Sequence, residues 1–195
     1  MVEHRKPLAR DQIPAFLKAL DCCGGHRTTL RLILLAFVRT AELRGSAWAG
    51  VGLLRAEWRI PGSRMKMREG HLVPLPDQAL ALVEELHTHM RGRPSLFRNY
   101  RIPKNHMSAT TLNRALERMG FSRKHGIGSS AHGSRATASM IPNEQGSRAD
   151  VIECQLALAE RNKTRAGYNQ AEYLDDRRLM LQHCADFVDE ISRAT

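Results

Sequence analysis

The sequence has 195 residues, 42% hydrophobic and 5% aromatic, which is typical of one globular, helix-rich domain. Its formal charge is +10 and its isoelectric point is about 10.1. This positive excess argues against an enzyme of small neutral metabolites and favours a polyanionic partner, nucleic acid before a membrane surface. No apolar run reaches the length of a transmembrane helix, and the charged first residues predict no signal peptide. We therefore expect a protein of the cytosol.

Cysteine usage agrees with a reducing compartment. The sequence contains Cys22, Cys23, Cys154 and Cys184, and none of these forms a Cys-x-x-Cys pair. We expect neither a structural metal nor a disulfide framework, and no cofactor.

The first part of the chain predicts two helices and a hairpin. Residues 1–10 are interpreted as a linker, and residues 11–195 as one domain. A first helix is expected over 11–20, and Thr28 or Thr29 is expected to cap a second that runs to about Val38. Two extended runs, 57–60 and 71–75, flank a basic loop and predict a β-hairpin.

Helical spacing returns in the second half. Residues 76–90 predict a helix, and a basic loop follows over 91–104. Residues 108–119 predict another helix, with apolar residues at i, i+3, i+4 and i+7. Arg114 and Arg118 lie together on its opposite face.

Three further helices are expected to close the chain. The first spans about 131–140, because Pro142 disfavours helix in the residue before it. The next begins at Ser147, where Asp150 three residues later indicates a capping box. The last spans about 170–191. The fold class is therefore mainly α with a small antiparallel β-sheet (α+β).

A histidine and an arginine, His132 and Arg135, share one face of the first helical turn. Free backbone N–H groups and the helix dipole favour an anion there. The pattern fits a phosphate site, and it also fits a solvated basic turn. Spacing alone leaves both interpretations open.

Three other basic or carboxylate positions also have two interpretations. Arg39 and Glu42 are either a plain intrahelical ion pair, or Glu42 holds the Arg39 fork so that it grips a phosphate. Lys66 lies in the basic loop of the hairpin, between Arg64 and Arg68. That loop is either solvated surface or an arm that enters a DNA groove and presents an ammonium group to a phosphodiester.

Tyr168 lies in a polar segment where a structural tyrosine has little to pack against. A tyrosine hydroxyl can act as a nucleophile and store a bond as a covalent ester.

The order Arg39, Lys66, His132-x-x-Arg135 and Tyr168 resembles the tyrosine recombinase family. Five longer strings are similar to its prophage-integrase branch and cover the chain from about residue 28: VRTAELRGSAW, EWRIPGSRMKMREGHLVPL, TLNRALERMG, HGSRATAS and RNKTRAGYNQAEYLDDRRLM. Five blocks in the same order are far more specific than any single motif.

The resemblance implies a role for each matched residue. Arg39 and Arg135 would clamp the scissile phosphate, and His132 would bind it and assist proton transfer. Lys66 would protonate the leaving 5′-oxygen, and Tyr168 would attack to give a 3′-phosphotyrosine. The activity implied is metal-free cleavage and rejoining of DNA at attachment sites, which integrates or excises a phage, prophage or genomic island.

Two departures from the family pattern stand out. The family has a histidine or tryptophan ten residues before the tyrosine, where this sequence has Leu158. An N-terminal arm or core-binding domain, which completes the DNA clamp, is not expected before residue 11. These departures leave a second hypothesis, a DNA-binding remnant of an integrase with impaired catalysis. A third hypothesis is a relaxing topoisomerase of related mechanism, against which the integrase-like strings argue.

The resemblance also implies partners: double-stranded DNA attachment sites, further protomers in a tetrameric synapse, and an excisionase or DNA-bending protein. A bacterial cytosolic, nucleoid-associated location follows. We expect Arg64 and Arg68 to contribute to DNA binding, together with Arg114 and Arg118.

Overall fold

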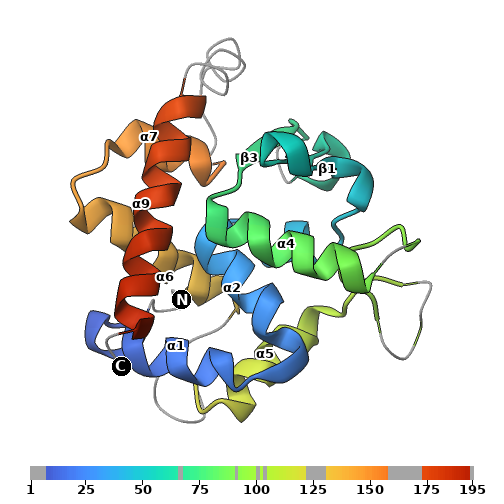
Figure 1. Ribbon diagram of the computed structural model, residues 1–195, viewed down its shortest axis with the longest axis horizontal. Coiled ribbons are helices and arrows are strands. Elements are labelled where there is room, and N and C mark those ends of the chain that lie inside the picture. Colours follow the sequence, from blue (N-terminus) through green and yellow to red (C-terminus); the bar gives the residue numbers. More distant parts are fainter. Residues whose placement is uncertain are drawn as a thin grey trace, which may run out of the picture.

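The computed structural model describes residues 8–65, 68–90, 92–99, 102, 105–121, 131–157 and 173–193; the side chains of residues 131 and 132 lie outside this description. Its helices are α1 (Ile13–Asp21), α2 (Arg27–Ala36), α3 (Thr40–Arg44), α4 (Asp77–His89), α5 (Ala109–Arg118), α6 (Ala131–Glu144), α7 (Ala149–Gln155) and α9 (Leu174–Arg193). Its strands are β1 (Val51–Gly52), β2 (Glu57–Ile60) and β3 (His71–Pro74). The mainly α fold with a small antiparallel sheet is confirmed (Figure 1).

Helix α2 lies at the centre of the helical body. Nearly all of its apolar residues are buried, and it packs against α1, α4, α6 and α9. The expected cap at Thr28 or Thr29 is wrong, because a 3₁₀ turn (Gly24–His26) leads directly into α2 and both threonines lie inside it. The helix ends at Phe37, whose left-handed φ of 55° turns the chain sharply.

The predicted hairpin is confirmed and belongs to a three-stranded antiparallel sheet in the order β1-β2-β3. Trp58 pairs with Val73 and Arg59 with Leu72. Trp58, Ile60 and Val73 are buried, whereas Arg59 between them is exposed, as the period of two in a strand requires. Strand β1 was not predicted, because two residues show no alternation.

Helix α5 follows its sequence pattern closely. Ser108 is its N-cap, and Leu112, Ala115 and Leu116 are buried on one face. Arg114 and Arg118 are exposed on the other. The apolar spacing alone positioned this helix correctly.

Two predicted boundaries near Pro142 are wrong. Helix α6 continues through Pro142 to Glu144. Proline costs little there because it stands in the last turn, and Ile141 and Pro142 are both buried. Helix α7 has Arg148 as its N-cap, and Asp150 pairs with Arg148. The Ser147 capping box therefore does not form.

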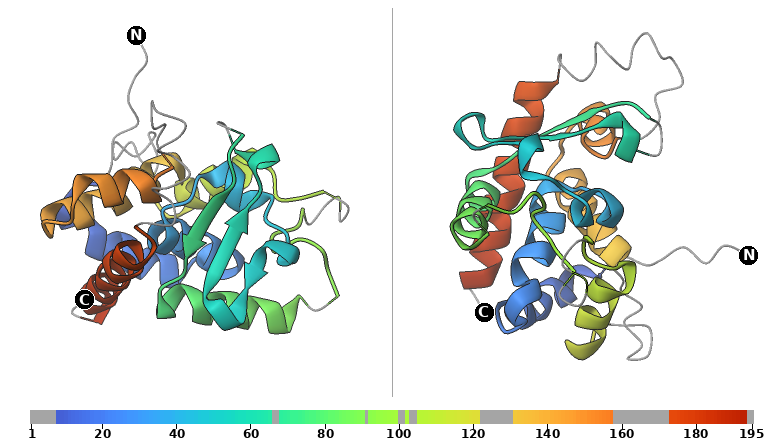
Figure 2. Two further views of the ribbon diagram at one scale, coloured as in Figure 1. Left: turned by 90° about the horizontal axis from the view of Figure 1, so that it is seen from above. Right: turned by 90° about the vertical axis from the view of Figure 1, so that its right-hand side faces the viewer.

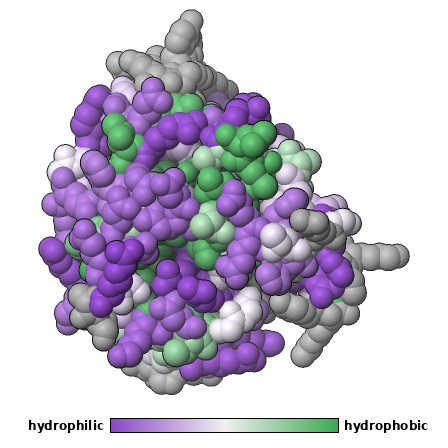
Figure 3. Space-filling view, viewed as in Figure 1, coloured by the Kyte–Doolittle hydropathy of each residue, from purple (hydrophilic) through white to green (hydrophobic). Residues whose placement is uncertain are grey.

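Helix α9 runs along one side of the molecule and packs against α1, α6, α7 and β3. Figure 2 shows the sheet beside α4 on one side of the molecule and α7 with α9 on the other. Hydrophilic side chains cover most of the face seen in Figure 3, and apolar side chains gather over the region of the sheet. Helix α3, strand β3 and the end of α7 therefore lie where the helical body meets the sheet.

Candidate functional site

Arg39 stands between α2 and α3, in extended conformation, as the N-cap of α3. Its guanidinium donates to Glu42 Oε1 at 2.7 Å, while its backbone N–H donates to Glu42 Oε2 at 2.8 Å. The same guanidinium donates to the carbonyls of Leu156 and Ala157, at 3.3 and 3.0 Å. Glu42 is 3% exposed, so a buried carboxylate fixes one edge of the fork and the end of α7 fixes another.

Arg135 comes from the first part of α6 and meets Arg39 at the same carbonyl. Its Nε–H donates to Phe37 O at 2.6 Å, and its NH2 group donates to Leu156 O. Burial lowers the pKa of Arg135 to about 10, and the charge of Arg39 adds to that shift, while Glu42 opposes it. The side chain remains a cation at neutral pH.

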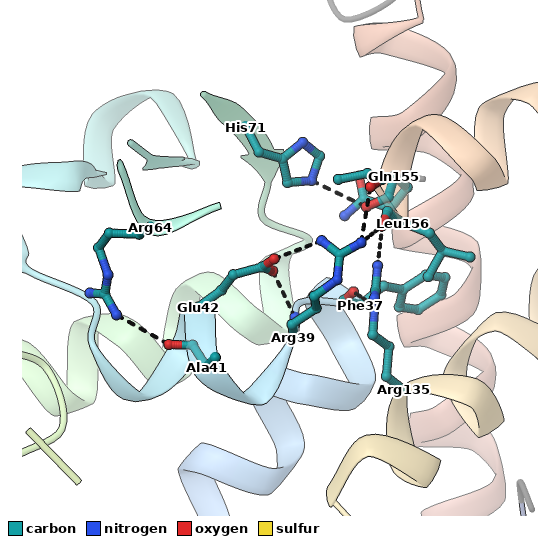
Figure 4. A network of polar contacts seen from close by, with 10 residues as sticks. Phe37, Arg39, Ala41, Glu42, Arg64, His71, Arg135, Gln155 and Leu156 are labelled. Carbon is teal, nitrogen blue, oxygen red and sulfur yellow. Dashed lines mark hydrogen bonds and ion pairs between the residues drawn. The ribbon is translucent and has the colours of Figure 1, made fainter. Parts of the chain in front are cut away.

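The two guanidinium groups thus share Leu156 O and lie side by side, with Glu42 on the far side of Arg39 (Figure 4). A guanidinium has five N–H donors. The bonds of Arg135 to described residues use two of them. Two cations against one carboxylate make a local excess of positive charge suited to an anion.

His71 and Gln155 border this cluster, and the sequence analysis missed both. His71 Nε2–H donates to the backbone carbonyl of Gln155 at 3.2 Å. Burial lowers the pKa of His71 to about 3, and the charges of Arg177, Arg135 and Arg39 contribute. His71 is therefore neutral at physiological pH. The sequence signal that could have indicated His71 is its place beside Gly70 at the start of a predicted strand.

Several residues expected at the site lie outside the described residues: Lys66, Leu158, Tyr168 and the side chain of His132. The backbone of His132 belongs to the first turn of α6, as its spacing predicted. The structure thus brings together Arg39, Glu42 and Arg135 of the expected set.

The four arginines expected to bind DNA lie in two regions. Arg64 donates to Ala41 O at 3.1 Å, so it lies against α3, and Arg68 is exposed in the same hairpin loop. Arg118 lines a pocket with Cys23 and His26, just before the start of α2. Arg39 follows the opposite end of α2, so Arg114 and Arg118 are separated from the arginine pair.

A hollow of about 560 Å³ lies between α3 and the sheet. Glu42, Arg64 and His71 contribute to its wall, and Trp58 and Ile60 supply apolar surface. It therefore adjoins the carboxylate that holds Arg39.

Among the described residues, no group of three or more His, Cys, Asp or Glu side chains is arranged to hold a metal ion. In the same part of the chain, no helix has the length and apolar character needed to cross a bilayer.

Solved structures share this fold. A Tn1549 transposon integrase in complex with circular intermediate DNA superimposes with a TM-score of 0.67 at 14% identity, covering 90% of this chain and 68% of that one. The XerA recombinase gives a TM-score of 0.65 at 16% identity, covering 88% and 65%. The fold is therefore that of a tyrosine recombinase catalytic domain.

Sequence comparison is more specific. The model of the phage integrase family matches residues 6–174, so the chain belongs to that family. The prophage integrase IntA of Escherichia coli (strain K12) is 38% identical over 181 residues, which cover 91% of this chain and 43% of that protein. The integrase of Enterobacteria phage P4 is 36% identical, covering 95% and 46%. The chain spans about half the length of these relatives.

Proposed function

We propose that this protein cuts and rejoins DNA strands at specific sites through a covalent 3′-phosphotyrosine. The observation that carries the proposal is the arginine pair: two guanidinium groups on one carbonyl, balanced by a single buried carboxylate. Such a cluster suits a phosphodiester, whose two non-bridging oxygens accept from two forks. The +10 charge of the chain supports the same partner.

The proposed chemistry balances without a metal or a nucleotide. The Tyr168 oxygen passes its proton to His132 as the general base and attacks phosphorus, and the bond from phosphorus to the 5′-oxygen breaks. Lys66 protonates that oxygen, which leaves as a 5′-hydroxyl. Arg39 and Arg135 stabilise the negative charge that grows on the phosphoryl oxygens, and His132 assists proton transfer. Attack by another strand's 5′-hydroxyl reverses the steps and joins new partners.

Leu158 stands where the family has a hydrogen-bond donor, so we expect slower cleavage than a histidine or tryptophan would support. Loss of one pre-organised donor costs about 10²–10³ in rate. The proposal is accordingly an active but slow enzyme, and the alternative is a DNA-binding remnant that has lost catalysis.

The partners we propose follow from the same activity. Among related structures, a Tn1549 transposon integrase is in complex with circular intermediate DNA, and a λ integrase dimer is bound to a COC′ core site. We infer that this protein likewise binds double-stranded attachment sites and assembles with further protomers, up to a tetrameric synapse. An excisionase or DNA-bending protein would set the direction of recombination, either integration or excision. The reaction would take place at the bacterial nucleoid.

Covalent trapping tests the proposal. The protein is incubated with a pool of nicked duplexes of randomised sequence, in which the cleaved 5′-hydroxyl fragment dissociates and leaves the adduct. We expect an SDS-resistant adduct that maps to Tyr168 by mass spectrometry, and the DNA in it to share a sequence. Tyr168→Phe should abolish the adduct with DNA binding unchanged, and Tyr173→Phe should preserve it.

Each other outcome has a definite meaning. DNA binding without any adduct favours the impaired remnant, and an adduct at Tyr173 or Tyr100 refutes our nucleophile. Relaxation of supercoiled DNA without a preferred sequence favours a topoisomerase.

A further inference from the structure

Arg177 is a fully buried arginine in the first turn of α9. Its Nε–H donates to the Gln155 side-chain oxygen at 2.9 Å, and its NH2 group donates to Leu72 O. No carboxylate pairs with it among the described residues. Burying a cation without an opposite charge is costly, and Arg39 and Arg135 already make this region positive. A residue kept at this cost calls for a specific explanation.

Gln155 is the residue through which Arg177 acts. It is 1% exposed, and both ends of its amide are engaged. Its oxygen accepts from Arg177, and its nitrogen donates to Ala36 O at 2.8 Å. One side chain therefore ties the last residue of α7 to α9 and to the end of α2.

The residues just after Gln155 hold the arginine pair. Leu156 O accepts from both Arg39 and Arg135, and Ala157 O accepts from Arg39. Any shift of the end of α7 therefore moves both guanidinium groups together. Figure 4 shows Gln155 and Leu156 meeting the pair from the side opposite Glu42.

We propose that Arg177 and Gln155 are positioning residues that fix the end of α7, and through the carbonyls of Leu156 and Ala157 set the geometry of the arginine pair. They also join the two helices that flank residues 158–172, the segment containing Tyr168. The inference rests on the proposed function only in those tests that measure DNA cleavage.

If Arg177 acts through its charge, its substitutions should behave differently than if it positions α7. A lysine keeps the charge but has no planar fork to reach Gln155 and Leu72 O together. If Arg177 positions α7, Arg177→Lys and Arg177→Met should both slow single-turnover cleavage, by up to about 10²-fold, as expected for a misplacement near 1 Å. DNA affinity should stay within about threefold. If the charge alone matters, Arg177→Lys should keep the wild-type rate, which would overturn the proposal.

Gln155 supplies the second pair of variants. Gln155→Leu loses both contacts and should match Arg177→Met. Gln155→Glu still accepts from Arg177 but cannot donate to Ala36 O, so its rate should lie between Gln155→Leu and wild type. Arg178→Met is the matched control, because Arg178 is the neighbour of Arg177 on α9 but is partly exposed and pairs with Glu57 of β2, not with Gln155. It should cleave at the wild-type rate.

Combining Gln155→Leu with a substitution at Arg135 distinguishes a positioning role from a general loss of stability. In an Arg135→Lys background, Gln155→Leu should add little further loss, because the pair it positions is already altered. Losses that multiply would show that the two act independently, which contradicts the proposal. If Arg177→Met fails to fold, Gln155→Glu and Arg177→Lys decide the question.

A readout without cleavage keeps this inference distinct from the proposed function. NMR signals of the Arg39 and Arg135 Nε–H groups are followed while inorganic phosphate is added. We expect phosphate to shift both signals in the wild type, and Gln155→Leu to weaken that binding. Absence of an adduct in the wild type would count against the proposed function; unchanged phosphate binding in Gln155→Leu would count against the positioning role.

Discussion

At the scale of single residues, orientation at the site comes from buried acceptors. Arg39 is held by a carboxylate and by two main-chain carbonyls, and Arg135 by two carbonyls. The sequence predicted the Arg39–Glu42 contact from its spacing of three residues. It did not predict the carbonyl partners, because a carbonyl carries no sequence signal.

Glu42→Ala should lower the free energy of unfolding by about 3 kcal/mol, as for the loss of one partner of a buried pair. Arg39 would lose its carboxylate, and its backbone N–H would lose its acceptor at the start of α3. Urea denaturation measures this. Asp21→Ala, which removes exposed contacts with Arg27 and Arg31, should cost clearly less. Equal losses would show that burial of Glu42 contributes nothing.

His71 should make the fold sensitive to acid. Its pKa is about 3 in the folded protein against 6.5 for the free side chain, so the unfolded chain binds the proton more readily. The stabilisation is complete above pH 6.5 and is lost as the pH falls toward 3. At pH 5 the loss is about 2 kcal/mol. Denaturation at pH 8 and pH 5 should show this difference in the wild type and in His89→Gln, but much less of it in His71→Leu.

At the scale of elements, regular periodicity was a reliable guide and boundaries were not. The spacing of Leu112, Ala115 and Leu116 predicted α5, and two extended runs on either side of a basic loop predicted β2 and β3. The predicted helix end before Pro142 is wrong because the burial of Ile141 and Pro142 outweighs one missing hydrogen bond near the end of α6. The predicted helix start at Ser147 is wrong because Asp150 pairs with Arg148 and does not complete a capping box. Tertiary packing decided both, and a local pattern carries no information on it.

The contact between the hairpin loop and α3 gives a prediction at this scale. A β-carbon on Gly45 would lie 1.6 Å from the Arg64 guanidinium, so Gly45→Ala must displace that flexible side chain. If Arg64 binds DNA, Gly45→Ala should weaken binding as much as Arg64→Ala does. The log–log salt slope should then become shallower by about 0.9. Ser63→Ala, in the same loop, should change neither. Unchanged binding in Arg64→Ala would remove Arg64 from the DNA interface.

At the scale of the whole molecule, the net charge should govern the proposed interaction with DNA. The excess of ten positive charges is spread over several elements, including the hairpin loop and α5. We expect weak binding whose affinity falls steeply with salt, by a log–log slope of about −0.9 for each phosphate contacted. A fluorescence anisotropy titration from low to moderate salt measures the slope. A slope near zero would contradict a DNA-binding function.

The whole fold also explains which part of the site the sequence could reveal. Arg39 and Arg135 lie far apart in the chain, and only the family's ordered motifs linked them. Arg177 carried a signal that went unused: it stands three and four residues before Met180 and Leu181, on the buried face of α9. A charged residue at an apolar position of an amphipathic helix marks a buried polar contact.

Main-chain anchoring of the arginine pair has a consequence for sequence drift. Phe37, Leu156 and Ala157 offer carbonyl oxygens, which every amino acid possesses. At Leu156 and Ala157, many side chains should therefore be interchangeable without disturbing the guanidinium groups. Homologous proteins are free to diverge at these positions while the geometry of the arginine pair persists. Alignments would then show variable columns at Leu156, whose carbonyl accepts from both arginines, and at Ala157, whose carbonyl accepts from Arg39.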